Sequence, residues 1–179
     1  MKSEILSLIL GSVFFLSILS PAIAQEATKI QAGDFEFTVA SPWKDKNAPR
    51  PMVKAVAVWT DPDGVHEPIN CAFYHFGEGQ GGTVRANVDR WKGQFQGAVE
   101  EDAEQLVIDG QKITLLHLRG TYMDGPMFGN KTPKKGYALL GAIFESPGGH
   151  VFLKATGPGA AIEASKASFR KMALSPTEK

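Results

Sequence analysis

The chain has 179 residues, and its 19 lysines and arginines balance 19 aspartates and glutamates, so the formal net charge is zero. A chain of this length can bury the core of one domain, and a neutral balance argues against a general nucleic-acid binder or a strongly basic membrane-surface protein. Cys71 is the single cysteine, which excludes an intramolecular disulfide and a cysteine-based zinc centre.

The N-terminus has the pattern of a secretory signal peptide. A charged start at Lys2 precedes an apolar run over residues 5–19, and Ala22-Ile23-Ala24 forms an A-x-A cleavage site. This pattern predicts that residues 1–24 are removed and that the mature chain starts at Gln25. The alternative is a membrane anchor, but the run is shorter than the roughly 20 residues that span a bilayer. We expect a periplasmic or secreted protein with no transmembrane segment after cleavage.

Three strands with short connections are expected in the first part of the mature chain. A polar N-terminal segment, 25–33, is expected to be flexible. Strands are predicted at 35–39, 53–60 and 70–75, where apolar and polar side chains alternate or β-branched and aromatic residues gather. Residues 44–51 are predicted to be a loop, and Asp61-Pro62-Asp63-Gly64 has the residue types of a tight turn.

A glycine-rich loop over residues 77–82 leads into the helix that organises the predicted fold. Val84, Val88, Trp91 and Phe95 follow the helical period and form one apolar stripe. Thr83 has the residue type of an N-cap, because its hydroxyl can accept a hydrogen bond from a free amide of the first turn. We expect the stripe to anchor this helix on a sheet.

The second half of the chain reads as a strand meander closed by a second helix. Residues 97–104 are predicted to be an acidic linker, and Asp109-Gly110 a hairpin turn. Residues 123–135 are predicted to be a long loop. Strands are expected at 105–108, 113–122, 137–144 and 151–155, and a helix at 160–174.

This order predicts an α+β fold, with an antiparallel sheet of about six to seven strands and two main helices packed on it. The fold would occupy residues 34–175 as a single domain, followed by a short tail over 176–179.

Two segments resemble PsbP-like proteins, the extrinsic photosystem subunits and their non-photosynthetic bacterial relatives. One is FEFTVASPW (35–43), which looks like their opening strand and proline–tryptophan turn, and the other is the final strand and helix ending in SFRKM (168–172). The middle of the chain is similar to uncharacterised exported bacterial proteins, through the glycine loop, NVDRW (87–91) and NKTPKKGY (130–137). The resemblance implies a PsbP-like α/β sandwich and a noncatalytic accessory or assembly role. It carries over no functional residue.

The glycine loop formally satisfies the dinucleotide fingerprint G-x-G-x-x-G. The expected export, the absence of a following parallel βαβ unit and the charge of Glu78 argue against that interpretation. A tight turn that uses the conformational freedom of glycine is favoured. A weaker alternative is an anion site, in which amides at the helix start act with Arg85.

His66, Glu67, Cys71 and His75 are the one group of metal-type residues in the sequence. Cys71 and His75 would lie roughly 13 Å apart along one strand, too far for one ion. His117 shares a strand face with Arg119, which is explained by a solvated face. No serine or cysteine nucleophile motif is present. We therefore predict no metal, cofactor or catalytic residue.

Lys131, Lys134 and Lys135 give the predicted 123–135 loop an unusual basic character, since Asp124 is its one acidic residue. Long loops in compact domains tend to be functional, although a solvated mobile loop is the plainer interpretation. The candidate binding residues are Gly79, Gly81, Gly82, Thr83, Arg85, Phe128, Asn130, Lys131, Lys134 and Lys135.

Two functions remain open at this point. The favoured one is an exported, noncatalytic binding or assembly module whose surface loops contact an unidentified protein or a small anionic ligand. The alternative is a periplasmic hydrolase or metal-dependent enzyme built on His75, His117 or His150. A cleft that gathers these histidines with a carboxylate would favour the enzyme, and histidines that lie apart would favour the module.

Overall fold

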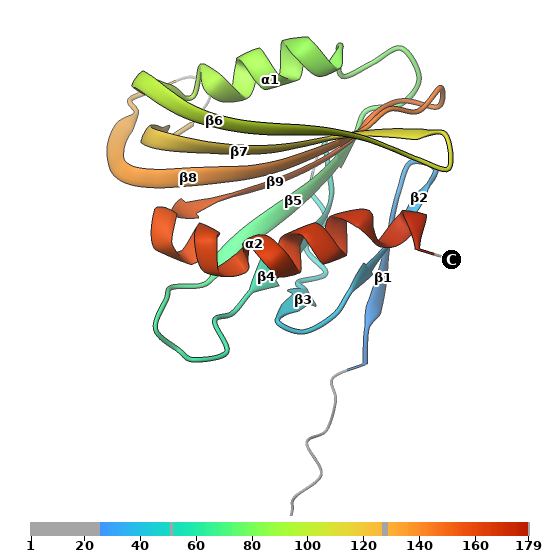
Figure 1. Cartoon of the computed structure of the whole chain (residues 1–179), viewed down its shortest axis with the longest axis horizontal. Coiled ribbons are helices and arrows are strands. Elements are labelled where there is room, and N and C mark those ends of the chain that lie inside the picture. The colour runs from blue at the N-terminus through green and yellow to red at the C-terminus, as the bar shows by residue number, and fades with distance from the viewer. Residues whose placement is uncertain (1–25, 51, 127–128, 179) are drawn as a thin grey trace, which may run out of the picture.

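The computed structural model describes residues 26–50, 52–126 and 129–178. A seven-stranded antiparallel sheet in the order β3-β4-β5-β9-β8-β7-β6 lies between α1 and α2, and β1 pairs with β2 in a small second sheet (Figure 1). The predicted α+β class is confirmed. The elements are β1 Thr28–Ala32, β2 Phe35–Val39, β3 Trp43–Asp45, β4 Val53–Trp59, β5 Ile69–His75, α1 Val84–Lys92, β6 Phe95–Ile108, β7 Gln111–Asp124, β8 Thr132–Phe144, β9 Val151–Pro158, α2 Gly159–Leu174 and the 3-10 turn Ser175–Thr177.

The face of the sheet beneath α1 is held by the predicted apolar stripe. Trp91 is 5% exposed and packs with Phe95, Leu139 and Phe152. The helix ends at Lys92, and Phe95 already belongs to β6. The spacing of the stripe thus predicted the position of the helix correctly but made it about one turn too long. Gly93 is the C-cap at which the helix ends.

The opposite face carries the larger core, between the sheet, α2 and the β1–β2 sheet. Strands β4, β5, β8 and β9 contribute alternate side chains to it, including the buried Cys71. Phe37 of β2 packs edge-on against Phe73 and Phe144, with ring centroids 5.3 Å apart in both pairs. Trp43 lies against Phe169 of α2 and donates a hydrogen bond to the Ser168 hydroxyl at 3.0 Å.

The predicted acidic linker over 97–104 is wrong, because these residues belong to β6. This strand lies at the edge of the sheet, so its charged side chains reach water while its backbone pairs with β7. The register places Glu100 opposite Arg119 and Asp102 opposite His117. A strand at the edge of a sheet can carry charged side chains along most of its length. The sequence of β6 therefore lacks the alternation of apolar and polar residues by which a strand is recognised, and it resembled a linker.

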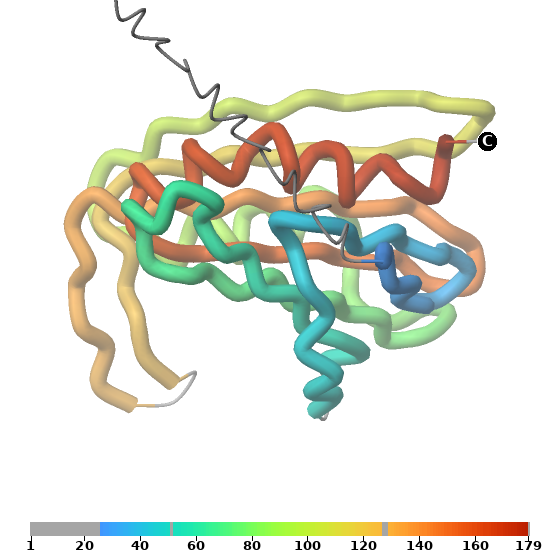
Figure 2. Tube along the Cα trace, turned by 90° about the horizontal axis from the view of Figure 1, so that it is seen from below, coloured from blue at the N-terminus to red at the C-terminus, as the bar shows by residue number. Residues whose placement is uncertain are grey.

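The predicted long loop over 123–135 is wrong at both ends. β7 continues to Asp124 and β8 begins at Thr132, so residues 125–131 connect the two strands of a long hairpin, in which Tyr122 pairs with Lys134. The β7–β8 hairpin projects beyond the body of the molecule (Figure 2).

Two short strands occupy segments that were predicted to be irregular. Residues 28–32 of the expected flexible segment 25–33 form β1, whose Ile30 and Ala32 are buried. β3 occupies the start of the expected 44–51 loop and pairs with β4. Both depend on tertiary partners that a local pattern does not reveal.

Candidate functional site

The glycine loop is a turn fastened to α1. Gly79, Gly81 and Gly82 have positive φ angles of 67°, 85° and 77°, which only glycine adopts at little cost. The Asn87 side-chain amide is 2% exposed and donates to the Gly81 and Thr83 carbonyl oxygens, both at 2.8 Å. Thr83 is the N-cap, as predicted, and its hydroxyl accepts from the Ala86 amide at 3.2 Å.

The topology does not suit a dinucleotide at this loop. All strand pairings within the described residues are antiparallel, and β6, the strand after α1, lies at the far edge from β5. Arg85 is highly exposed and pairs with Asp89 on its own helix, at 3.7 Å. These observations favour the interpretation of the glycine loop as a turn.

The lysine group lies on the β7–β8 hairpin. Asn130, Lys131 and Lys135 are exposed and Lys134 is half-buried, while Phe128 lies outside the described residues. Within the described part of the chain, none of the three lysines forms an ion pair. Positive charge on this hairpin is therefore left to solvent or to another molecule.

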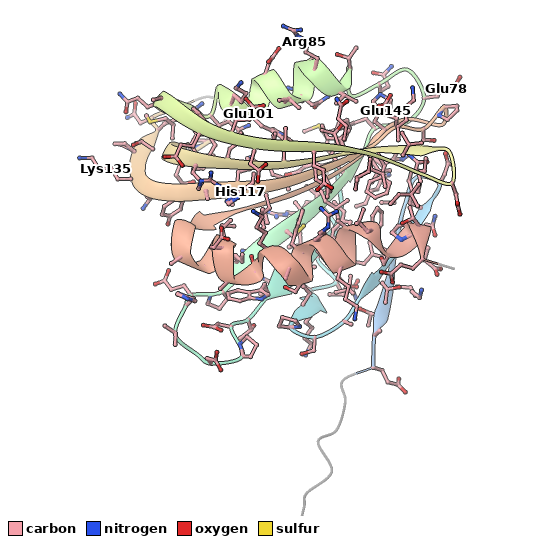
Figure 3. All side chains as sticks on the ribbon, viewed as in Figure 1. Glu78, Arg85, Glu101, His117, Lys135 and Glu145 are labelled. Atoms are coloured by element: carbon pink, nitrogen blue, oxygen red, sulfur yellow. The ribbon has the colours of Figure 1, made fainter. Side chains whose placement is uncertain are left out.

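The two groups of candidate residues do not form one site. Lys135 points outward at one end of the long axis of the molecule, while Glu78 of the glycine loop lies toward the other end and Arg85 lies on the outer side of α1 (Figure 3). A single ligand of modest size cannot contact both groups.

The histidines make separate interactions. His75 Nε2 lies 3.1 Å from the Gly148 carbonyl oxygen, and His150 Nδ1 accepts from the Ser146 amide at 3.3 Å. His66 lies in the connection between β4 and β5. No three His, Cys, Asp or Glu side chains of the described chain come close enough to hold a metal ion. Burial raises the pKa of the Cys71 thiol, which makes it unreactive.

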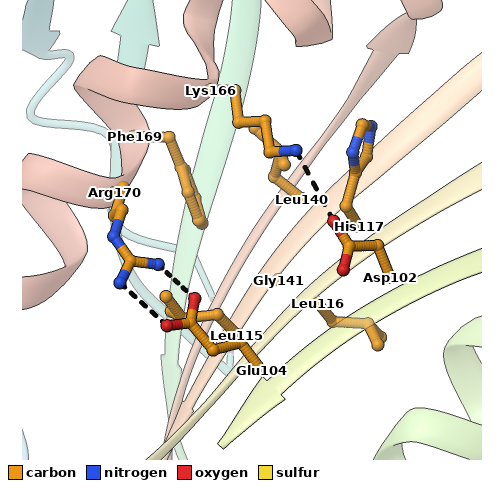
Figure 4. A pocket seen from close by; sticks show the side chains of 10 residues that line it. All are labelled: Asp102, Glu104, Leu115, Leu116, His117, Leu140, Gly141, Lys166, Phe169 and Arg170. Carbon is orange, nitrogen blue, oxygen red and sulfur yellow. Dashed lines mark hydrogen bonds and ion pairs between the residues drawn. The ribbon is translucent and has the colours of Figure 1, made fainter. Parts of the chain in front are cut away.

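His117 is buried, contrary to the solvated face that its sequence position suggested. It is 3% exposed and lies in a small pocket between α2 and strands β6, β7 and β8 (Figure 4). Its Nε2 atom has no hydrogen-bond partner, an arrangement that costs about 1–3 kcal/mol for a buried polar group. The alternation of side chains along the strand correctly predicted that His117 and Arg119 share a face. Sequence reasoning did not show that α2, some 45 residues later in the chain, packs over His117.

A half-buried polar group lies on the α1 side of the sheet. Lys154 of β9 donates to Gln94 Oε1 at 2.5 Å and to the Tyr122 hydroxyl at 3.4 Å, and its amine lies 5.5 Å from the centre of the Tyr122 ring. Burial lowers the pKa of Lys154 to about 8. A lysine inside the apolar 151–155 strand was the available signal for this group, and the sequence interpretation did not use it.

Within the described residues, no helix combines enough length and apolar character to cross a membrane. This finding concerns residues 26–50, 52–126 and 129–178 and does not include the apolar run over 5–19.

A solved structure has a similar fold, while the two other comparisons found no match. No protein-family model matches the chain, and no curated protein matches it in sequence. The solution structure of cyanobacterial PsbP (CyanoP) from Synechocystis sp. PCC 6803 is similar, with a TM-score of 0.51 at 16% identity, over 93% of this chain and 96% of that one. A crystal structure of a protein of unknown function from Pseudomonas aeruginosa has a TM-score of 0.45 at 12% identity, over 81% and 92% of the two chains. The likeness to CyanoP concerns the fold alone, and this chain has a PsbP-like α+β fold.

Proposed function

We propose that the protein is an exported, noncatalytic binding or assembly module that contacts an acidic partner protein through the β7–β8 hairpin. The observation that carries this proposal is the projecting hairpin, on which Lys131, Lys134 and Lys135 form no ion pair within the described residues. Lysines in such a place steer an acidic surface toward the protein and are available to pair with it.

Backbone pairing between β7 and β8 orders much of the hairpin before any partner binds. The β7–β8 ladder extends as far out as the pair of Asp124 and Thr132, so Lys134 lies opposite Tyr122 in a paired strand and Lys131 directly precedes that strand. A surface that is already ordered loses less conformational entropy when it binds. The likeness to CyanoP is compatible with an accessory role, although it supports the fold alone.

The enzyme alternative has less support. Its test was a polar cluster of His75, His117 and His150 with a carboxylate in one cleft, and these histidines instead bond to different neighbours. The small pocket that contains His117 has other features and is considered below.

Site-specific photocrosslinking tests the hairpin. A photoreactive residue at position 131 or 135, in cells that make the protein naturally, should give a crosslinked product with one partner protein. The exposed Lys44 of β3 and Lys112 at the opposite end of β7 are matched control positions, from which that product should be absent. Equal crosslinking from the control positions would contradict a docking hairpin.

Charge reversal then tests the electrostatic part of the proposal. Lys131→Glu, Lys134→Glu and Lys135→Glu together should leave the fold intact and weaken binding to the crosslinked partner. Lys44→Glu with Lys112→Glu is the control. Parental binding should weaken with added salt, because the screening length falls from about 10 Å at 0.1 M to about 3 Å at 1 M. A folded triple variant with parental affinity at low salt would overturn the proposal.

A further inference from the structure

His117 Nε2 is the one buried side-chain nitrogen or oxygen without a hydrogen-bond partner in the described part of the chain. The hydrogen bond at the other ring nitrogen, Nδ1, determines whether Nε2 carries a proton. Arg119 Nη1 lies 2.8 Å from His117 Nδ1, and since a guanidinium can only donate, Nδ1 must accept. The neutral ring therefore carries its proton on Nε2. Arg119 is itself held by Glu100, at 3.0 Å, so this tautomer is supported by a chain of hydrogen bonds.

His117 lines a cavity whose walls combine apolar side chains with the charged side chains of β6 and α2. Leu115, Leu140 and Phe169 line the cavity, which has a volume of about 80 Å³ (Figure 4). That volume is about half the roughly 150 Å³ of an apolar cavity that binds benzene in another protein. A molecule of a few non-hydrogen atoms therefore fits, with one hydrogen-bond acceptor for Nε2.

Two ion pairs between β6 and α2 border the cavity. Lys166 Nζ lies 3.6 Å from Asp102 Oδ2, and Arg170 makes two hydrogen bonds to Glu104 (Figure 4). All four side chains are at least two-fifths exposed, so these pairs are weak and their separation is easy. A small molecule can therefore enter between β6 and α2 without disturbing the core.

The surroundings of the His117 ring keep it neutral. Burial is the largest cause that lowers the pKa of His117, and the positive charges of Arg119 and Lys166 lower it further. Glu163 and Asp102 act in the opposite direction and contribute less. The surroundings therefore oppose an added proton on the ring, and Nε2 keeps its role as a neutral hydrogen-bond donor.

We propose that this cavity binds a short aliphatic carboxylate, with one oxygen accepting the hydrogen bond from His117 Nε2 and the hydrocarbon part against Leu115, Leu140 and Phe169. Glu163 shows that a carboxylate approaches this nitrogen, because its Oε2 atom stops 4.0 Å away on the exposed side of α2. Glu163 is 64% exposed and competes with the ligand from outside the cavity.

Titration with sodium butyrate, followed by NMR of leucine methyl groups at constant ionic strength, tests the proposal. Shifts should saturate and should be localised at Leu115 and Leu140. His117→Phe should weaken binding about tenfold or more, because it removes a hydrogen bond to a charged acceptor. Glu163→Gln should tighten binding, because it removes the competing charge. Lys44→Glu on β3 is the matched control and should bind butyrate like the parent.

Three outcomes would overturn the proposal. The first is the absence of saturable shifts, which would mean that the cavity holds water alone. The second is a folded His117→Phe variant that binds butyrate like the parent. The third is equal binding of butanol, which lacks the carboxylate. Glu163 is exposed, so Glu163→Gln keeps the fold and tests the competition even if His117→Phe does not fold.

Discussion

Lys154 and His117 place a titratable nitrogen on each face of the sheet, and burial opposes a positive charge on both. They differ in their partners. Lys154 donates to two neutral oxygens, those of Gln94 and Tyr122, while His117 accepts from Arg119 at one nitrogen and has no partner at the other. Both groups therefore lower stability when they are protonated, but over different pH ranges.

Lys154→Met should stabilise the protein at pH 7. The pKa of Lys154 is about 8 in the folded state and 10.5 ordinarily, so the unfolded state binds its proton more tightly. The full penalty is present below pH 8 and disappears as the pH rises toward 10.5. After allowance for two lost hydrogen bonds, the expected gain is about 1–3 kcal/mol at pH 7. Urea unfolding at pH 7 and pH 9.5 measures it. A variant less stable than the parent at pH 7 would show that the hydrogen bonds outweigh burial.

His117→Phe should make stability less sensitive to acid. The pKa of His117 is lowered in the folded state by burial and by Arg119 and Lys166, against Glu163 and Asp102. The unfolded chain therefore takes up the proton first as the pH falls below about 6.5, and the parent loses stability there. The variant lacks this loss. Denaturation at pH 7.5 and 5.5 compares the two slopes, and equal slopes would mean that His117 gains its proton without penalty.

At the scale of elements, α1 makes a close contact with β8, between Trp91 and Gly141. A Cβ atom on Gly141 would lie 2.3 Å from Cζ3 of Trp91, so the absence of a side chain at 141 lets the indole reach the sheet. The stripe of α1 could be read from the sequence because its spacing is local. The position on β8 that contacts Trp91 could not be read from the sequence, since nothing local distinguishes Gly141 from any other glycine in an apolar strand.

A double-mutant cycle tests this contact. Trp91→Ala should cost about 3–5 kcal/mol through lost burial, and Gly141→Ala about 1–3 kcal/mol through overpacking. The double variant should be more stable than the sum of the two losses implies, because the new methyl group would enter the space left by the indole. Thermal unfolding of the four proteins gives the coupling energy. Strict additivity would show that the two residues do not share this contact in solution.

The elements that sequence reasoning missed have a common physical cause. β6 is stabilised by its ladder with β7 and by ion pairs with α1 and α2, such as Lys92 with Glu101 and Lys166 with Asp102. These partners are distant in the chain or lie on the exposed side, so the local pattern remained polar. Strands with an apolar face, such as β4 and β8, were predicted because burial leaves a local signature.

At the scale of the whole molecule, the candidate residues divide between two distant places. Residue types correctly predicted local features: Thr83 is the N-cap of α1, and the glycines of residues 77–82 form a turn. Their separation along the long axis depends on topology (Figure 3). The pocket near His117 combines residues of β6, β7, β8 and α2, so no short motif could have indicated it.

The predicted cleavage site lies just before the first strand of the folded domain. Cleavage after Ala24 would leave Gln25 as the first residue, three positions before β1. N-terminal sequencing of the protein from a soluble periplasmic fraction should therefore give Gln25. An intact Met1 in a membrane fraction would favour the anchor interpretation instead.

A chain that starts at Gln25 should also keep its full stability, whereas one that starts at Asp34 should not. The shorter chain lacks Ile30 and Ala32, which are 4% and 1% exposed, and the whole β1–β2 ladder. Burial of one isoleucine and a few ladder hydrogen bonds together contribute about 3–5 kcal/mol. Thermal unfolding of the two chains compares them. Equal stability would mean that β1 adds little to the core. Residues 25–33 would then be flexible in solution, as the sequence predicted.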